Sequence, residues 1–303
     1  MGLDLLPNPA LDLYLKIVLI ATTLAIGTMF IDTKIKFSQL FNIVVKAEFI
    51  FLLPMVFKTA WFRFFQKLNR LAFRFAGQRQ LLKDISLTVK KGECVAIVGE
   101  SGCGKSTFIQ ILQKFYPFES GAVTINNSIA LSEIKTENWR DIIDVIPQEI
   151  AVFNGNVVDN LLLSPEDNPA DVEKFIADYG FMPFIQSLPQ GFATILGEEG
   201  INLSGGQKQM IALIRTLYRK PQLLILDEFT SGMDRETEQF ALQLINRLKA
   251  EIAILFVSHR LYSLKNIADR IYIFDKGTVS HSGTHAQLLA SSNFYSDYWE
   301  QFS

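Results

Sequence analysis

Hydrophobic positions along the chain fall into two patterns, long runs near the N-terminus and short runs from about Leu68 onward. The first long run, residues 13–31, is interrupted by a single charged residue, Lys16. A helix rises about 1.5 Å per residue, so this run is long enough to span a hydrocarbon core of about 30 Å. We predict a membrane helix here, with a buried core helix as the alternative. A signal peptide fits poorly, because Asp4 and Asp12 stand where a basic region is required.

A second apolar run, residues 41–62, is weaker because Lys46, Glu48, Pro54 and Lys58 interrupt it. A charge at the bilayer centre costs about 2.5–3.5 kcal/mol by insertion measurements, so the run fits either a second span or an amphipathic helix in the interface. Basic residues at its end favour a cytoplasmic position for the rest of the chain, unless they form an ordinary solvated face. They are Lys58, Arg63, Lys67, Arg70 and Arg74. We expect residues 1–66 to form a hydrophobic segment with one or two membrane helices, in contact with membrane lipid.

From about Leu68 the pattern changes to short β-like runs that alternate with helical periods. The runs are ECVAIVG, GAVTI, LLILDE, AILFVSH and RIYIF. Strands that are apolar almost throughout and separated by helices are typical of a parallel sheet covered on both faces. We therefore predict an α/β domain with a largely parallel sheet over residues 67–303.

Composition and charge narrow the class of protein. Lys and Arg number 29 and Asp and Glu 31, so the chain has no overall basic footprint and we expect no nucleic-acid partner. Hydrophobic residues make up 49%, which is high for a soluble enzyme, and the excess lies in the first 65 residues. The two cysteines, Cys94 and Cys103, suit reduced thiols in a cytosolic domain better than a disulfide framework.

A glycine-rich stretch, GESGCGKS at residues 99–106, fits the phosphate-loop pattern G-x-x-x-x-G-K-[ST]. It comes after the predicted strand Cys94–Val98 and precedes a helical stretch, residues 106–114, which is the context that the pattern requires. Its backbone N–H groups can surround phosphates at the positive end of the helix. We expect Lys105 to bridge the β- and γ-phosphates and Ser106 to ligate Mg²⁺. The predicted nucleotide-binding residues of the loop are Gly99, Ser101, Gly102, Cys103, Gly104, Lys105, Ser106 and Thr107.

Two carboxylates, Asp227 and Glu228, end the apolar run LLIL. They would be costly inside a sheet unless they emerge at the carboxyl edge of the strand, where ligands bind in open α/β sheets. We expect Asp227 to hold the Mg²⁺ shell and Glu228 to polarise a water for in-line attack on the γ-phosphate. Many strands end in an acidic residue, so this prediction depends on the phosphate loop.

The pentapeptide LSGGQ, residues 203–207, precedes the apolar helical run 210–217. Ser204 and the N–H groups of Gly205 and Gly206 form a second anion-binding helix N-terminus, although one nucleotide does not need two. Here the sequence resembles the ATP-binding-cassette (ABC) family, whose signature this pentapeptide is. The resemblance implies that Ser204, Gly205, Gly206 and Gln207 bind the nucleotide of a second cassette, in a head-to-tail homodimer or heterodimer.

The resemblance covers residues 68–301 and implies further roles. Phe75 stands where the family usually has an aromatic ring stacked on adenine. Gln148, in VIPQE, resembles the Q-loop glutamine, which senses the metal and the attacking water. Asp234 ends SGMD, which resembles the D-loop, and His259 in VSHR resembles the switch histidine that contacts the γ-phosphate. Together with Glu228, Gln148 and His259 are the predicted catalytic residues, and Ser106, Gln148 and Asp227 are the predicted metal ligands.

Several stretches resemble exporter-type cassettes in particular, namely GEEG at residues 197–200, NGNVVDNLLL and GTHAQLLASSNFY. They are similar to peptide- or bacteriocin-exporting and lipid-flippase-like half-transporters. Phe229 and Gly232 replace alanines that are common in the family's DEATSALD, and IRTLYRK replaces the more usual ARAL pattern. Because none of these changes removes a group that touches phosphate, metal or water, we expect a competent ATPase that uses ATP and Mg²⁺.

The resemblance also implies a membrane context. Such exporters carry about six membrane helices before the cassette, whereas one clear run and one weaker run precede residue 67 here. We therefore expect either a short membrane-tethered cassette that works with a separate multi-span subunit, or a truncated or fused product. The expected location is the inner or plasma membrane, with the cassette on the cytoplasmic side. A non-transport ABC ATPase and an inactive cassette are the alternative functions.

Overall fold

The computed structural model describes residues 65–126, 128–162, 167–197 and 201–300. These residues all belong to one unit, Arg63–Ser303. The membrane helices predicted at residues 13–31 and 41–62 lie outside the described residues. Within the described ranges, no helix is both long enough and apolar enough to cross a membrane.

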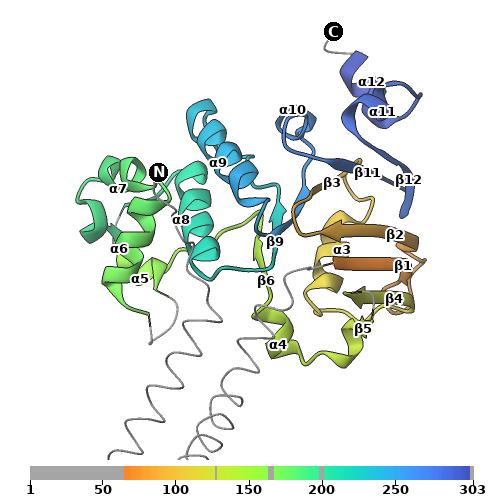
Figure 1. Ribbon diagram of the computed structural model, residues 1–303, viewed down its shortest axis with the longest axis horizontal. Coiled ribbons are helices and arrows are strands. Elements are labelled where there is room, and N and C mark those ends of the chain that lie inside the picture. The colour runs from red at the N-terminus through yellow and green to blue at the C-terminus, as the bar shows by residue number, and fades with distance from the viewer. Residues whose placement is uncertain (1–64, 127, 163–166, 198–200, 301–303) are drawn as a thin grey trace, which may run out of the picture. The chain divides into compact units, whose positions relative to one another are not determined.

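The larger sheet has six strands in the order β12-β11-β3-β10-β9-β6 (Figure 1). Every neighbouring pair from β11 to β6 is parallel, and β12 pairs with β11 antiparallel. The strands are β3 (Cys94–Val98), β6 (Ile143–Ile146), β9 (Leu223–Asp227), β10 (Ala253–Val257), β11 (Arg270–Asp275) and β12 (Thr278–Gly283). The prediction of a largely parallel sheet is confirmed.

A smaller antiparallel sheet, which the hydrophobic pattern did not predict, has the order β2-β1-β4-β5. Its strands are β1 (Phe65–Phe73), β2 (Leu82–Lys90), β4 (Ser120–Ile125) and β5 (Ile129–Ala130). The run GAVTI, expected in the parallel sheet, lies instead in β4. In β4 the residues Val123 and Ile125 are buried while Ser120–Ala122 are exposed, so only part of this run faces a core.

Helices separate most strands of the larger sheet along the chain. They are α3 (Lys105–Leu112), α4 (Thr136–Arg140), α5 (Val157–Leu161), α6 (Pro169–Asp178), α7 (Met182–Ser187), α8 (Gly205–Tyr218), α9 (Arg235–Leu248), α10 (Leu261–Leu264), α11 (His285–Leu289) and α12 (Phe294–Glu300). Two 3-10 turns, Leu131–Glu133 and Gly191–Ala193, and the short strands β7 (Gly155–Asn156) and β8 (Ile195–Leu196) complete the described elements. Figure 1 shows α5–α8 at one end of this unit and the antiparallel sheet at the other.

The core explains why the parallel strands are so apolar. β3 and β10 are buried at every position. β9 is buried at its four aliphatic positions and ends on the half-buried Asp227. Because parallel strands end at the same edge of a sheet, the residues directly after β3, β9 and β10 lie close together. This edge therefore collects the polar residues of the predicted site.

Candidate nucleotide-binding site

The phosphate loop is shaped by two close backbone approaches. A Cβ atom on Gly99 would lie 2.2 Å from the carbonyl oxygen of Phe274, and a Cβ atom on Gly104 would lie 2.5 Å from Cδ2 of Leu82. Both glycines also have φ in the positive region, at 149° and 105°. Glycine is therefore required at the first and last glycine positions of the motif. Gly104 is also the N-cap of α3, so the loop leads directly into a helix N-terminus.

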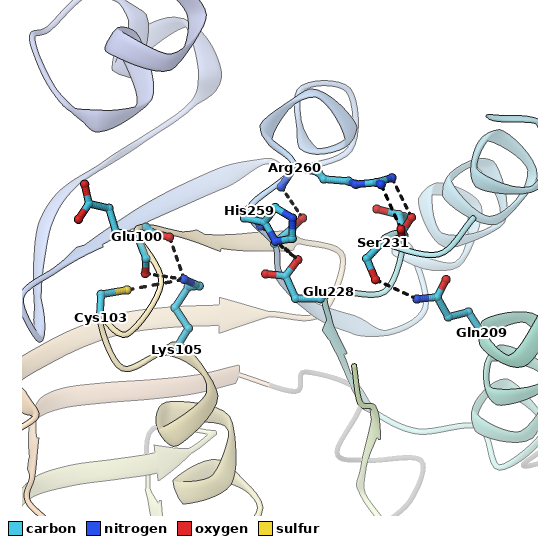
Figure 2. Close-up of polar contacts among 11 residues, drawn as sticks. Glu100, Cys103, Lys105, Gln209, Glu228, Ser231, His259 and Arg260 are labelled. Carbon is cyan, nitrogen blue, oxygen red and sulfur yellow. Dashed lines mark hydrogen bonds and ion pairs between the residues drawn. The ribbon is translucent and has the colours of Figure 1, made fainter. Parts of the chain in front are cut away.

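Lys105 is held against the loop that precedes it (Figure 2). Its Nζ donates hydrogen bonds to the carbonyl oxygens of Gly99, at 2.8 Å, and Glu100, at 2.9 Å. The sulfur of Cys103 lies 3.8 Å from the same nitrogen. The ammonium group thus lies at the centre of the loop, where the sequence predicted phosphate contacts. Ser101, Gly102 and Ser106 are exposed and Thr107 is half-buried, so several of the predicted loop residues are accessible.

Asp227 lies at the carboxyl end of β9, as the sequence predicted. Burial, followed by the charge of the neighbouring Glu228 carboxylate, raises the pKa of its carboxyl to about 6, while the ammonium of Lys105 opposes the shift. These influences show that Lys105 and the two carboxylates share one electrostatic environment. Asp227, Ser106 and Pro147 also line one pocket, which places the residue before Gln148 beside the carboxylate.

Glu228 leaves the strand through a left-handed backbone conformation, with a φ of 52°. Its N–H donates to the carbonyl oxygen of Val257 at the end of β10, at 2.9 Å, which fixes it between the two strand ends. A non-glycine residue at positive φ is uncommon and is found preferentially at functional sites, where neighbouring contacts hold it. The side chain is 11% exposed.

Glu228 and His259 form the closest polar contact of the site (Figure 2). His259 Nδ1 lies 2.5 Å from Glu228 Oε2, and the backbone N–H of His259 donates to the same oxygen at 3.4 Å. Both contacts use Oε2, so Oε1 has no protein partner among the described residues. The imidazole is 61% exposed, and its Nε2 is the ring nitrogen left for another partner. The carboxylate is therefore oriented by the histidine while one of its oxygens stays available.

A polar network that no sequence motif indicated extends from this pair. Arg260 Nη1 and Nη2 donate to the carbonyl oxygens of Thr230 and Ser231, each at 3.0 Å. Gln209 Nε2, on α8, donates to Ser231 Oγ at 3.3 Å. The sequence places Arg260 next to His259, but it does not indicate which carbonyl groups Arg260 binds, because these depend on the tertiary fold.

The signature pentapeptide forms the N-terminus of α8. Ser204 is the N-cap: its Oγ accepts from the N–H of Gln207 at 3.2 Å, and its own N–H donates to Gln207 Oε1 at 2.9 Å. This capping box leaves the N–H groups of Gly205 and Gly206 as first-turn donors. In Figure 1, α8 and α3 lie apart, with β9 and β6 between them, so this chain does not bring its signature to its own phosphate loop.

Asp234 has a structural role in this conformation. It is the N-cap of α9, and its two carboxylate oxygens accept from the N–H and the Oγ1 of Thr237, both at 2.9 Å. The backbone hydrogen bond, followed by the hydroxyl one, lowers the pKa of its carboxyl. Among the described residues, the Asp234 carboxylate therefore caps a helix. It makes no hydrogen bond there to the residues gathered around Glu228.

Phe75 and Gln148 each lie two residues beyond the end of a strand, β1 and β6 respectively. Phe75 comes after β1, is half-buried, and packs edge-on against Phe73 and Tyr116, with ring centroids 4.9 and 5.4 Å apart. Gln148 is exposed and lies two residues beyond the end of β6. The structure thus gathers Lys105, Asp227, Glu228 and His259 at one sheet edge and leaves the signature on a separate surface.

Several known proteins are similar to this chain in sequence or structure. Residues 82–231 match the family model described as ABC transporter. The "ABC-type transporter MDR1" of Aureobasidium melanogenum is 41% identical over 226 residues, which are 74% of this chain and 16% of that protein. The "ATP-dependent lipid A-core flippase" of Acinetobacter baylyi is 35% identical over 231 residues, which are 76% of this chain and 40% of that protein.

A solved structure shows the same fold. It is a bacterial Atm1-family ABC exporter with ATP bound, which matches with a TM-score of 0.73 and 27% identity and covers 88% of this chain and 51% of that chain. The chain spans less than half the length of the two curated relatives.

Proposed function

The chain belongs to the ABC transporter family, and we propose that its exporter-type cassette binds and hydrolyses ATP to drive transport across a membrane. The observation that carries this proposal is the orientation of Glu228 by His259, at 2.5 Å, on the sheet edge that also holds Lys105 and Asp227. A buried carboxylate with one oxygen fixed and the other available is suited to activate a water next to a bound phosphate. The exporters named above are similar in sequence or structure to this chain.

ATP would bind with its phosphates in the loop 99–107. Phosphate oxygens would replace the carbonyl oxygens of Gly99 and Glu100 as partners of the Lys105 ammonium, and the N-terminus of α3 would add backbone donors. Phe75 offers an aromatic face at the end of β1 on which adenine can stack. The ring of Phe75 stands nearly perpendicular to the rings of Phe73 and Tyr116, with interplanar angles of 83° and 85°.

The residues present fit Mg²⁺. Ser106 and Asp227 line one pocket, and Gln148 is next in sequence to Pro147 of the same pocket, which gives a hydroxyl, a carboxylate and an amide oxygen. Oxygen donors with one or two carboxylates suit Mg²⁺, which completes its shell with water and substrate phosphate. The raised pKa of Asp227 reports a buried carboxylate that a cation would stabilise in its ionised form. When bound, Mg²⁺ would neutralise charge on the β- and γ-phosphates.

Glu228 would act as the general base. A water hydrogen-bonded to Oε1 would give its proton to the carboxylate as it attacks the γ-phosphorus, and the bond to the β-phosphate oxygen would break. His259 would hold Oε2 through Nδ1 and contact the γ-phosphate through Nε2. Gln148 would position the water and the metal from the exposed segment after β6.

A second cassette would complete the site. The N–H groups of Gly205 and Gly206, with Ser204 and Gln207 at the same helix N-terminus, form an anion-binding end that lies apart from the chain's own phosphate loop. Two cassettes arranged head to tail would therefore place each signature on the partner's ATP. Asp234 would lie near that interface, because it begins α9 directly after the loop that packs on the signature.

The proposed setting is the inner or plasma membrane, with the cassette in the cytoplasm. The hydrophobic residues 1–66 would contact lipid, and a multi-span membrane subunit or domain would receive the motion of the cassettes. Nucleic acid is not a partner in this proposal, since the formal net charge is −2 at pH 7.

Glu228→Gln tests the catalytic assignment. The amide keeps the size of the side chain and an acceptor for His259, but it cannot take a proton. We expect ATP turnover, measured as phosphate release, to fall at least about 100-fold. ATP binding should persist, and size-exclusion chromatography with Mg²⁺ and ATP should show a trapped dimer.

The matched control is Glu251→Gln, which makes the same change on the exposed turn after α9 and should keep normal turnover. A Glu228→Gln protein with turnover within about twofold of the wild type would contradict the assignment. Equal rates for the wild type and Lys105→Ala would indicate an inactive cassette.

A further inference from the structure

Gln209 is a buried amide that makes one hydrogen bond among the described residues, through its nitrogen and not its oxygen. The residue is 3% exposed, its Nε2 donates to Ser231 Oγ at 3.3 Å, and its Oε1 has no partner among the described residues. An unpartnered buried acceptor costs about 1–3 kcal/mol, so an apolar side chain of similar volume would serve the core at least as well. Stability therefore does not account for a glutamine at this position of α8.

Its partner, Ser231, lies at the centre of the network around the proposed base. The carbonyl oxygen of Ser231 accepts from Arg260 Nη2 at 3.0 Å, and its N–H donates to the carbonyl oxygen of Glu228 at 3.0 Å. Arg260 is the residue directly after His259, which holds Glu228 at 2.5 Å. Figure 2 shows these side chains in sequence from Gln209 on α8 to the Glu228–His259 pair.

The same loop, residues 229–234, also contacts the signature through backbone atoms. A Cβ atom on Gly206 would lie 2.9 Å from the carbonyl oxygen of Gly232, and one on Gly232 would lie 3.0 Å from the carbonyl carbon of Gly205. The first turn of α8 and the loop therefore have no space between them. A displacement of the signature must move the loop.

We propose that Gln209 is a positioning residue that transmits movement of the signature, through Ser231 and Arg260, to the Glu228–His259 pair of the same chain. This inference rests on the proposed function, in which the signature of one chain engages the partner's ATP while Glu228 serves the chain's own ATP. The network then makes hydrolysis at one site depend on occupancy of the other. Its structural basis is a single loop that contacts α8 on one side and the catalytic residues on the other.

Mixed dimers of the full-length chain test the direction of this coupling. Two differently tagged copies are purified together, and Glu228→Gln in one copy leaves a single active base. Gln209→Met is placed either in the copy with the intact Glu228 (cis) or in the copy with Glu228→Gln (trans). We expect ATP turnover to fall about five- to tenfold in cis and less than about twofold in trans, because the network runs within one chain.

Stability separates positioning from a merely structural role. Since methionine removes an unpartnered buried acceptor, Gln209→Met should unfold at the same temperature as the wild type or higher. The matched control is Gln239→Met, which makes the same change at an exposed position of α9. It should alter neither the ATP turnover nor the unfolding temperature. Equal losses in cis and trans, or a lowered unfolding temperature of Gln209→Met, would overturn the inference.

An error in the proposed function gives a result that differs from an error in this inference. If mixed dimers with unmodified Gln209 show no turnover, the ATPase assignment is wrong, and hydrogen exchange then tests the network alone. In the Glu228→Gln background, ATP should slow amide exchange over residues 229–234 when Gln209 is present and not in Gln209→Met. Equal protection in both proteins would overturn the inference.

Discussion

At the scale of single residues, the two replacements of alanine in the family's DEATSALD pattern have different structural consequences. Phe229, in place of alanine, is fully buried and belongs to the hydrophobic core cluster. Gly232, in place of alanine, lies in backbone contact with Gly205 and Gly206. The larger residue fills space in the core, while the smaller one allows a closer approach to the signature.

Gly232→Ala should therefore destabilise this chain, although alanine is common at the position in the family. The new Cβ would lie 3.0 Å from a backbone carbon of Gly205, so a main-chain segment rather than a flexible side chain must move. Overpacking of this kind costs about 1–3 kcal/mol. Thermal unfolding should show a lower midpoint, and turnover should fall because the loop leaves its place beside Glu228. An unchanged midpoint would mean that the backbone segments at Gly205 and Gly232 move apart without loss of stability.

At the scale of elements, α5 and α8 are joined by a buried polar cluster. The side chain of Asn160 accepts from Phe153 N–H at 2.8 Å and from Arg215 Nη2 at 2.7 Å, and donates to the carbonyl oxygens of Phe153 and Asn156 at 2.9 and 3.1 Å. Arg215 on α8 also donates to the carbonyl oxygens of Asn160 and Ala151. Asn160 thus fixes the segment after Gln148 to the signature helix.

Asn160→Leu should lower the free energy of unfolding by about 2–3 kcal/mol. Leucine has a similar size, but it leaves the N–H and carbonyl of Phe153 and one Arg215 donor without the buried amide that now satisfies them. Urea unfolding measures the change. Asn246→Leu, at an exposed position of α9, is the matched control and should stay within about 0.5 kcal/mol of the wild type. Equal values for the two variants would show that water satisfies the cluster.

His285 gives the C-terminal helices a pH-dependent contact. Its Nδ1 lies 2.7 Å from the hydroxyl of Tyr295, its ring centroid lies 5.3 Å from that of Trp299, and burial, followed by the charge of Lys265, lowers its pKa below the usual 6.5. On acidification the unfolded chain takes up this proton first, so the contribution to stability is present above about pH 6.5 and is lost below it.

The variant His285→Phe keeps the ring and removes the titration. Between about pH 7.5 and pH 5.5 the unfolding midpoint of the wild type should fall more than that of the variant. The two falls should differ by no more than about 2 °C, because the ring is partly exposed. Parallel curves for the two proteins would contradict the assignment of this dependence to His285.

At the scale of the whole molecule, the sequence predicts the elements that depend on local pattern. It does not predict those that depend on pairing between segments distant in sequence. Buried runs such as CVAIV and AILFV predict parallel strands, because only a strand covered on both faces is apolar throughout. The antiparallel sheet is missed because the nine residues of β1, FQKLNRLAF, mix polar and apolar positions and include bulges in their pairing. Strand register requires knowledge of the partner.

The same division applies to the candidate site. The phosphate loop, the two carboxylates and His259 are recognisable from short motifs, and the structure gathers them at one edge. The carbonyl partners of Arg260 and the unpartnered Oε1 of Gln209 result from how residues distant in sequence pack together, so no motif predicts them. The positions of residues in motifs were predictable, whereas the contacts that hold them were not.

The order of strands in the larger sheet has a consequence for biosynthesis. Both hydrogen-bonded neighbours of β3 are strands made much later, β10 (Ala253–Val257) and β11 (Arg270–Asp275). The strand that carries the phosphate loop therefore has neither edge paired until β10 and β11 have left the ribosome. Contacts so distant in sequence form slowly, and an unpaired apolar strand is prone to aggregation. We expect nascent chains that stop before Ala253 to need a chaperone, and the phosphate loop to be among the last parts of the cassette to fold.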